Sequence, residues 1–561
     1  MGGSQVTHAF IKQDRVVTSP RIAFVFLAAA LLCFRAHAEE EKPLRVLTTQ
    51  TLRNYVTQFN ADDEELFSNI KNSDAFAFLE KNIPLFECPN EDFQRTYYFR
   101  WWTYRKHVKS TPDGYVVTEF MPNVDWAGKH NTISCPAAHH FYEGRWLLNT
   151  AILDDYATFW LRKGGSPRSY SFWIADAYYN RNLVTPNNDF LVDLLPDLIK
   201  NYEAWEEGWE WSTQKIHIGQ RDNGMFYTLD DRDGGEVSIG GDGFRPTLNS
   251  FMYGDAKAIA NISRMAGDGD QAERFEDKAS AIKQLVQEKL WDKDAQFFKV
   301  LPVGQDAKLK DVKELYGYTP WYFNLPDPGY EAGWKELMDP KGFYAPYGPT
   351  FAEQRHPGFK ISYADHECQW NGPSWPLATC SVLTGLANLL NNYEQGVIGK
   401  KEYFETLKIY TMSHQRKRED GKVVPWIDEN LNPFTGDWIS RTRLHAWSKT
   451  DPDLEKRKGG KDRGKDYNHS TYNDLIITGL VGLRPRADDV VEVNPLLPDD
   501  TWGYFCLDKV PYHGRILTII WDKTGERYGK GQGLTVFSDG KKVAHAHTLT
   551  RVTGDIGLTL K

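Results

Sequence analysis

The feature that most constrains the fold is a succession of amphipathic helical segments separated by polar, Gly or Pro breaks. Within each segment apolar residues recur at steps of three and four. The predicted helices cover residues 62–81, 92–107, 136–161, 171–183, 190–207, 247–266, 270–291, 374–393, 400–415 and 471–483. Consecutive helical hairpins favour a mainly α fold, a solenoid closed into a barrel, over a parallel sheet. No fixed sequence period points to an array of identical repeats.

The pattern changes near residue 484, where alternating segments typical of strands begin. Residues 515–521 and 533–537 alternate apolar and polar side chains, and a Gly-rich turn at 528–533 separates them. We therefore expect a helical domain at 39–484 and a small C-terminal β-sandwich at 485–561.

The N-terminus has the order of a secretory signal peptide. Three basic residues precede the apolar run 22–34, and Ala36-His37-Ala38 follows it, directly before acidic residues. The run is too short to span a bilayer comfortably. We expect residues 1–38 to be removed, leaving a secreted or periplasmic protein with no membrane span.

Charge and cysteine content exclude several classes of function. The formal net charge is -9 and the pI is near 6.0, so nucleic-acid phosphates and anionic membrane surfaces are not expected partners. The mature chain would keep five widely spaced cysteines, which suit neither a disulfide framework nor a zinc cluster. The composition leaves the oligomeric state open.

Aromatic residues are abundant, at 14% of the chain with 19 Trp and 28 Tyr. Such an excess suits a carbohydrate partner, because the apolar face of a sugar ring stacks on an indole, but an aromatic-rich core would explain it equally well. Four long loops, at 209–245, 294–323, 342–373 and 423–468, are rich in Gly, Trp, Asp and Tyr, and loops of this length are usually functional. The charged stretch 451–466 is expected to be a solvated, mobile insertion.

A Gly-rich turn before the helix that begins near Pro246 contains a candidate acid, Glu236. Glycines allow a ligand to approach closely, and the apolar neighbours of Glu236 would desolvate its carboxyl group, which suits a general acid. Asp233 and Asp242 lie on the same turn and are alternative acids. A calcium-binding loop or a plain turn would also explain the glycines.

A second carboxylate cluster lies on a late loop, where Asp428 and Glu429 stand between Trp426 and Trp438. Acids among tryptophans make sense where a polar ligand is both stacked and hydrogen-bonded. The turn residues that follow are explained by structure alone.

Two further segments contribute candidate binding residues. Trp370, Asn371 and Trp375 stand at the predicted start of a helix and are expected to form an aromatic platform. A purely structural explanation of the segment is a helix start that contains Pro and has Ser374 as its N-cap. In the helix 92–107, large rings crowd around Arg100, and they cannot all face one packed stripe, so Trp101 and Trp102 are expected at a cavity.

Arg100 could then donate to sugar hydroxyls or be buried for structural reasons by a carboxylate. His139 could bind a ligand or be a satisfied core histidine, and no third ligand stands at the spacing of a zinc site. We expect neither a metal nor a cofactor.

Three of these segments resemble a known family. Trp370-Asn-Gly-Pro-Ser-Trp375, Glu429-Asn-Leu-Asn-Pro-Phe-Thr-Gly436 and the helix start 245–255 are similar to six-hairpin glycosidases of the mannosylglycerate-hydrolase-like group. That group is related to glycoside hydrolase family 63 and, more distantly, to trehalases. The resemblance covers about residues 97–483 and implies an (α/α)6 barrel that hydrolyses glycosidic bonds.

The resemblance also implies roles for individual residues. Such enzymes invert the anomeric carbon with two carboxyl groups, and the late motif makes Glu429 the general base. Glu236 falls where relatives most often have Asp, and it becomes the general acid. The substrate-binding residues are then expected to be Arg100, Trp101, Trp102, His139, Arg245, Trp370, Asn371, Trp375 and Trp426.

Two other functions compete with an exo-acting, inverting glycoside hydrolase. A binding protein that has lost activity would lack one of the two carboxylates, and both are present. A polysaccharide lyase would use a Tyr or His base with a charge-neutralising Asn or Arg, which Tyr98, Arg100, His139 and Asn371 could provide. The sugar stays open among α-glucosides, α-mannosides and arabinosides.

Overall fold

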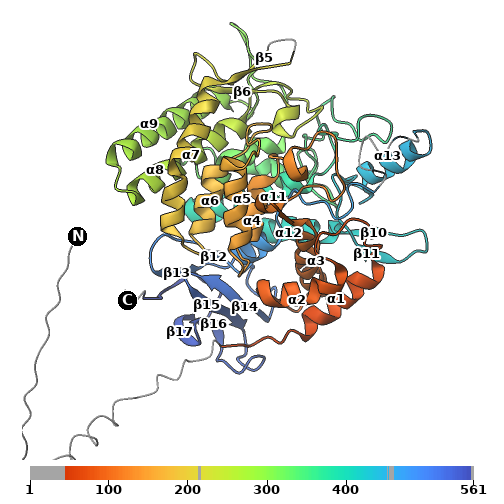
Figure 1. Ribbon diagram of the computed structural model, residues 1–561, viewed down its shortest axis with the longest axis vertical. Helices are drawn as coiled ribbons and strands as arrows, with labels where there is room; N and C mark the ends of the chain where they lie inside the picture. The colour runs from red at the N-terminus through yellow and green to blue at the C-terminus, as the bar shows by residue number, and fades with distance from the viewer. Residues whose placement is uncertain (1–43, 213–215, 452, 454–459, 461, 558–561) are drawn as a thin grey trace, which may run out of the picture. The chain divides into compact units, whose positions relative to one another are not determined.

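A computed structural model describes residues 44–212, 216–451, 453, 460 and 462–557 (Figure 1). The predicted signal peptide at 1–38 lies outside the described residues. The described chain before residue 481 contains all of its α-helices. The helices are α1 (Gln50–Asp62), α2 (Asn72–Asn82), α3 (Glu91–His107), α4 (Ala137–Gly144), α5 (Ala151–Arg162), α6 (Ile174–Asn182), α7 (Asn188–Glu207), α8 (Pro246–Met265), α9 (Gly269–Leu285), α10 (Thr319–Tyr322), α11 (Pro376–Asn392), α12 (Lys400–Ser413), α13 (Ile439–Ser448) and α15 (Asn473–Leu475).

The helices pack in a continuous series. α3 contacts α12, which contacts α11; α11 contacts α10, α10 contacts α8, α8 contacts α6, and α6 contacts α4. The short helix α15 contacts both α3 and α4, so the series returns to its start. α7 and α9 pack against α8, and α5 packs against α7. The predicted mainly helical fold is confirmed.

Helix α3 shows how local sequence and packing combine. Asn90 caps it by accepting from the backbone N–H groups of Asp92 (3.0 Å) and Phe93 (3.2 Å), and acids begin and bases end the helix. Its residues are buried almost all round, from Thr96 to His107. The crowded aromatic run therefore belongs to a helix that is covered on almost every side. Phe99 and Trp102 of this run line one small pocket.

Some helix bounds differ from the prediction. Residues 136–161 form two helices, α4 and α5, and between them Arg145 and Trp146 donate to the buried carboxylate of Asp474. Of the predicted helix 62–81, only the part from Asn72 onward is helical. Asp62 is the last residue of α1, a helix that the sequence did not predict. Asp63 instead pairs with the buried ammonium of Lys106 at 2.6 Å.

The C-terminal part contains two antiparallel sheets. One has the order β1-β14-β15-β16-β17, formed by Leu85–Glu87, Tyr504–Tyr512, Arg515–Asp522, Gly533–Ser538 and Lys541–Ala546. The other has the order β12-β13-β18, formed by Leu483–Arg484, Val490–Val493 and Val552–Asp555. The two predicted strands are confirmed as β15 and β16, which pair in register at Ile519 and Val536.

The N-terminal region also belongs to this sheet. β1 pairs with β14, and the carboxylate of Asp508 accepts from the backbone N–H groups of Val46 (2.7 Å) and Leu47 (2.9 Å). The described residues accordingly form one compact unit. The boundary at residue 484 stays a prediction.

Short hairpins stiffen the long loops between helices. They are β2 (Val108–Thr111) with β3 (Gly114–Val117), β8 (Trp291–Asp292) with β9 (Phe297–Phe298), β10 (Gln415–Lys417) with β11 (Val423–Pro425), and a sheet of β4 (Trp209–Trp211), β5 (Ile216–Gln220), β6 (Phe226–Thr228) and β7 (Gly243–Phe244). The five cysteines in the described ranges are free thiols. Among the helices of the described chain, none has the length and apolar character needed to cross a bilayer.

Candidate active site

Three of the long loops, 209–245, 342–373 and 423–468, meet with the segment 119–135 around a cavity of about 480 Å³. Its charged wall contains Glu119, Asp231, Arg232, Glu236, Glu367, Glu429 and Arg463. Its aromatic wall contains Phe120, Trp126, Tyr170, Trp370, Trp375 and Tyr467. A concave site with aromatic walls and convergent polar groups is the usual form of a small-molecule or sugar site.

Glu236 lies in the wall of this cavity, on the turn between β6 and β7. Its backbone oxygen accepts from the N–H of Trp370 at 3.1 Å, which joins the acid to the aromatic platform. Burial, together with the negative charges of Asp231 and Glu429, raises the pKa of Glu236 to about 8. The group therefore keeps its proton at neutral pH, as a general acid must.

The backbone of the acid turn is under constraint. Val237, directly after Glu236, has a φ of 64°, an unfavourable region for a β-branched residue. Gly234 has the same φ, and a Cβ there would stand 2.6 Å from the Sγ of Cys135, so only glycine fits. A positive φ at a residue such as Val237 persists where contacts with the surrounding structure hold the backbone in place.

A neighbouring segment holds this turn at both ends. The carboxylate of Glu314 accepts from the N–H of Gly240 at 2.8 Å, and the hydroxyl of Tyr316 donates to the backbone oxygen of Gly234 at 2.8 Å. Tyr316 belongs to the 3-10 helix η4 (Leu315–Tyr318). The acid is therefore positioned by contacts far along the chain.

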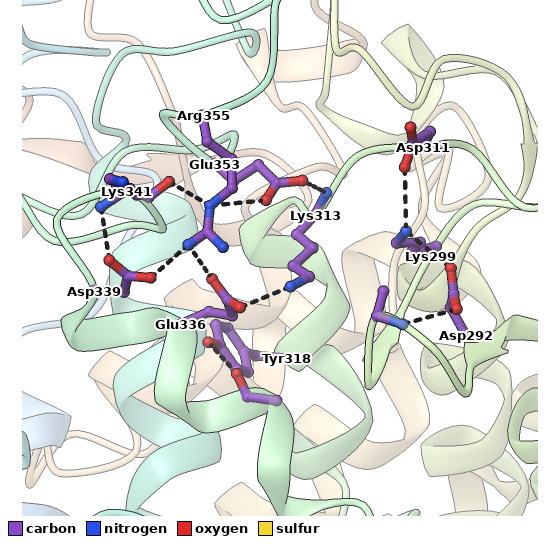
Figure 2. Close-up of polar contacts among 12 residues, drawn as sticks. Asp292, Lys299, Asp311, Lys313, Tyr318, Glu336, Asp339, Lys341, Glu353 and Arg355 are labelled. Atoms are coloured by element: carbon purple, nitrogen blue, oxygen red, sulfur yellow. Dashed lines mark hydrogen bonds and ion pairs between the residues drawn. The ribbon is translucent and has the colours of Figure 1, made fainter.

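An ion-pair network fixes the segment that grips the turn (Figure 2). Lys313 pairs with Glu336 of the 3-10 helix η5 (Glu331–Met338) at 2.6 Å, and its backbone N–H donates to Glu353 at 2.9 Å. Arg355 pairs with Glu336 at 2.8 Å and with Asp339 at 2.5 Å. These contacts tie Lys313, the neighbour of Glu314, to two other parts of the chain.

The alternative acids on the turn are placed elsewhere. Asp233 is buried and pairs with Arg245 at 2.7 Å, and it also accepts from the hydroxyl of Thr247. Asp242 is exposed and accepts from the N–H of Asp230 at 2.9 Å. Neither lines the cavity, whereas Glu236 does. Arg245 is thus engaged by Asp233 at the start of α8.

Glu429 lies on the loop between β11 and α13, a different loop from the one that contains the acid turn. Its Oε2 accepts from the hydroxyl of Ser440 at 2.7 Å, and the Sγ of Cys368 stands 3.7 Å away. Its Oε1 is 3.1 Å from Nη2 and 3.2 Å from Nε of Arg463. The guanidinium thus holds the carboxylate from two donor atoms.

Arg463 comes from the charged stretch 451–466, which was expected to be solvated. That expectation is wrong for the described residues near its end: Arg463 is 2% exposed, and Lys465 and Asp466 are buried as well. Arg463 pairs with Glu367 at 3.5 Å in addition to Glu429, and its guanidinium lies 5.1 Å from the ring centre of Trp126. Burial of these charges is possible because each one is paired.

Glu119 is another carboxyl group of the cavity, and the sequence did not indicate it. It follows β3 and accepts a hydrogen bond from the hydroxyl of Tyr467. Burial, with the negative charges of Glu429 and Glu236, raises its pKa to about 8. No local pattern marks Glu119, because its partners come from segments more than a hundred residues away.

Trp370 and Trp375 line the cavity as a stacked pair. Their ring centres are 3.8 Å apart with an interplanar angle of 9°, and Trp375 Nε1 donates to the backbone oxygen of Gln369 at 2.7 Å. The two side chains are 2% and 3% exposed, so each presents a small area to a ligand.

Several predicted binding residues do not line this cavity. Arg100 donates to the backbone oxygen of Ser470 (2.6 Å) and to Nε2 of His414 (2.9 Å) inside the helical core. The remaining residues outside the cavity wall are Trp101, Trp102, His139, Arg245, Asn371 and Trp426. His139 contacts Ser381 Oγ at 3.4 Å, and Trp426 packs against the guanidinium of Arg416 at 4.1 Å.

The residues that a lyase would need are likewise not assembled here. Tyr98 donates to the backbone oxygen of Phe86 at 2.9 Å within the core, and it does not line the cavity. Within the described part of the chain, no group of three or more His, Cys, Asp or Glu side chains is arranged to hold a metal ion.

Comparison with known families identifies the catalytic part of the chain. The model of the mannosylglycerate hydrolase MGH1-like glycoside hydrolase domain matches residues 129–470, and these residues include Glu236 and Glu429. The model of the C-terminal domain of glycosyl hydrolase family 65 matches residues 483–545, which contain most strands of the two sheets.

Solved structures show the same fold. A protein described as a sialidase is 41% identical with a TM-score of 0.82, over 91% of this chain and 45% of that one. This chain therefore spans less than half of that protein's length. A GH78 family rhamnosidase of Bacillus sp. GL1 is 11% identical with a TM-score of 0.51, over 78% of this chain and 40% of that one. At that identity the similarity concerns the fold alone.

The family match covers more than half of the chain, and it confirms the resemblance carried by the Trp370 and Glu429 motifs. The chain belongs to the MGH1-like glycoside hydrolase family.

Proposed function

We propose that this protein is a secreted or periplasmic glycosidase that removes sugars from the ends of oligo- or polysaccharides with inversion of the anomeric carbon. The observation that carries the proposal is that Glu236 and Glu429 lie in the wall of one cavity in different electrostatic settings. Glu236 is held protonated by burial, while Glu429 is in contact with the Arg463 guanidinium. This difference is the one that an acid and a base require.

The proposed reaction is a single displacement. Glu236 gives its proton to the glycosidic oxygen as the bond from that oxygen to the anomeric carbon breaks. Glu429 takes a proton from a water molecule, whose oxygen forms the new bond at the opposite face of the sugar. Exchange with solvent then returns each carboxyl group to its starting state.

The fold and the size of the site support this proposal. The series of helix contacts that returns from α4 to α3 supports an (α/α)6 barrel at residues 39–484, followed by a β-sandwich at 485–561. A cavity of about 480 Å³ suits the end of a chain more than a long internal stretch. The predicted signal peptide supports export.

The charges of the cavity favour hydrolysis over the lyase alternative. A lyase acting on uronic acids needs a group that neutralises the substrate carboxylate. The guanidinium of Arg463 is already paired with Glu429 and Glu367, and that of Arg232 is 3.2 Å from Asp231. Elimination would give an unsaturated product that absorbs ultraviolet light, which distinguishes the two reactions.

The decisive experiment follows two variants on two kinds of substrate. A screen of aryl glycosides, including α-glucosides, α-mannosides and arabinosides, first identifies the sugar. Glu236→Gln and Glu429→Gln should each lower kcat by about a hundredfold to ten-thousandfold, because each role is worth that factor. Asp242→Asn, on the same turn but exposed, is the matched control and should keep full activity.

Glycosyl fluorides separate the two roles, because fluoride leaves without an acid. Glu236→Gln should keep most of its rate on the fluoride of the right anomer, and Glu429→Gln should not. NMR of the first product should show the inverted anomer. A product that keeps the substrate configuration would contradict the single displacement.

A further inference from the structure

Glu119 is one of the carboxyl groups in the cavity wall that the proposed reaction does not use. Glu119 is 5% exposed and lines the same cavity as Glu236 and Glu429. Its backbone is held in place: the N–H of Asn468 donates to the Glu119 oxygen at 3.2 Å, and the Asn468 side chain donates to Thr118 at 3.2 Å. The residue is therefore fixed against the segment that carries Tyr467.

Tyr467 orients the carboxyl group. Its hydroxyl donates to Oε1 of Glu119, and its ring lies 4.0 Å from that of His469 and 4.8 Å from that of Phe120, measured between ring centres. Both of these rings also line the cavity. A side chain whose rotamer is locked by such contacts is preorganised for a ligand.

The electrostatic setting determines the form of the carboxyl group. The pKa of Glu119 is raised to about 8, mainly by burial and further by the negative charges of Glu429 and Glu236. At neutral pH the group is then a neutral acid with an O–H to donate. In the contact between the two residues, the hydroxyl of Tyr467 is the donor and the carboxyl group of Glu119 is the acceptor. This contact therefore does not use the O–H of Glu119.

We propose that Glu119, oriented by Tyr467, is a substrate-binding residue that donates a hydrogen bond to a hydroxyl of the sugar ring whose glycosidic bond is cut. The geometry carries this assignment: a fixed carboxyl group stands in the cavity beside the two carboxyl groups of the reaction. The ligand group is an uncharged ring hydroxyl. The inference rests on the proposed glycosidase reaction.

Two substitutions at Glu119 separate a neutral donor from an ionised acceptor or base. Gln keeps the size, the neutral charge and an N–H donor, so Glu119→Gln should retain kcat/KM within about fivefold of the wild type. Ala removes the donor, so Glu119→Ala should lower kcat/KM by about tenfold or more, mainly through KM. The substrate is the aryl glycoside that the screen identifies.

Deoxy substrates test the contact itself. The penalty of Glu119→Ala should disappear on the one monodeoxy glycoside that lacks the contacted hydroxyl, and persist on the others. A merely structural role of Glu119 would give equal losses on every member of the series. Tyr467→Phe should raise KM on the same substrates as Glu119→Ala, by a smaller factor.

A matched pair outside the cavity controls for loss of packing. Tyr142 donates to the carboxylate of Asp176 at 2.6 Å between α4 and α6, and neither residue lines the cavity. Tyr142→Phe and Asp176→Asn should lower the melting temperature while leaving KM unchanged. Circular dichroism and melting curves of all variants confirm that each one is folded.

The outcomes distinguish this inference from the reaction on which it rests. Full activity of Glu119→Ala, with Glu236→Gln and Glu429→Gln inactive, would overturn the role of Glu119 alone. Glu119→Gln that is inactive on the aryl glycoside yet active on the fluoride would make Glu119 the acid and also overturn it. A wild type that cleaves none of the glycosides would reject the proposed function and this inference together.

Discussion

Removal of the arginine beside the proposed base is the sharpest test of the site. Arg463 is 2% exposed, contacts Glu429 at 3.1 Å and Glu367 at 3.5 Å, and lies over the ring of Trp126. Arg463→Met fills a similar volume but leaves two buried carboxylates without their cation. Arg463→Lys keeps the charge and loses the planar fork that meets the Glu429 carboxylate with two donors.

The expected magnitudes follow from burial and contact distance. Breaking a buried ion pair by removing one partner lowers the free energy of unfolding by about 3–5 kcal/mol. Loss of an opposite charge in contact with a carboxylate makes its ionised form less favourable. Because the base must be ionised, the acidic limb of the activity profile of Arg463→Met should move to higher pH.

The assay is kcat/KM as a function of pH, with melting curves for both variants. At pH values below its shifted acidic limb, Arg463→Met should have a kcat/KM lower than that of the wild type by about tenfold or more, and part of this loss should disappear at higher pH. The acidic limb of Arg463→Lys should stay close to that of the wild type. An acidic limb that stays in place in folded Arg463→Met would refute the electrostatic role of Arg463. Equal losses at every pH would instead indicate a role in shape alone.

Three other predictions follow from the same structure. The alkaline limb of kcat/KM should lie near pH 8, because Glu236 must be protonated to act. The folded chain also holds a proton on Glu236 that the unfolded chain releases. The free energy of unfolding should therefore fall as pH rises from the usual carboxyl range to about 8, which melting curves would show. Trp370→Ala or Trp375→Ala should weaken kcat/KM by about 1 kcal/mol or more, and unchanged kinetics in both would assign the pair to packing. Edman sequencing of the exported protein should start near Glu39, and a start at Met1 would argue against export.

The sequence by itself determined the features that local patterns carry. Periodicity placed the helices within a few residues, as for α3, α7, α8 and α12, because a helix must bury one face whatever its partners are. The Gly-rich turn and the late loop motif indicated Glu236 and Glu429, since glycines and clustered acids among tryptophans are unusual where only packing is needed. The family match at residues 129–470 confirms the resemblance that these motifs carried.

Only the tertiary structure decided which charged groups share the site. Arg463 looked like part of a solvated charge run, and it is buried because Glu429 and Glu367, from two other loops, compensate its charge. The sequence left Arg100 open between a ligand-binding and a buried structural role, and the structure shows its contacts with Ser470 and His414 in the core. A buried ion or hydrogen-bond donor is stable only with a partner in space, and that partner leaves no mark in the neighbouring sequence.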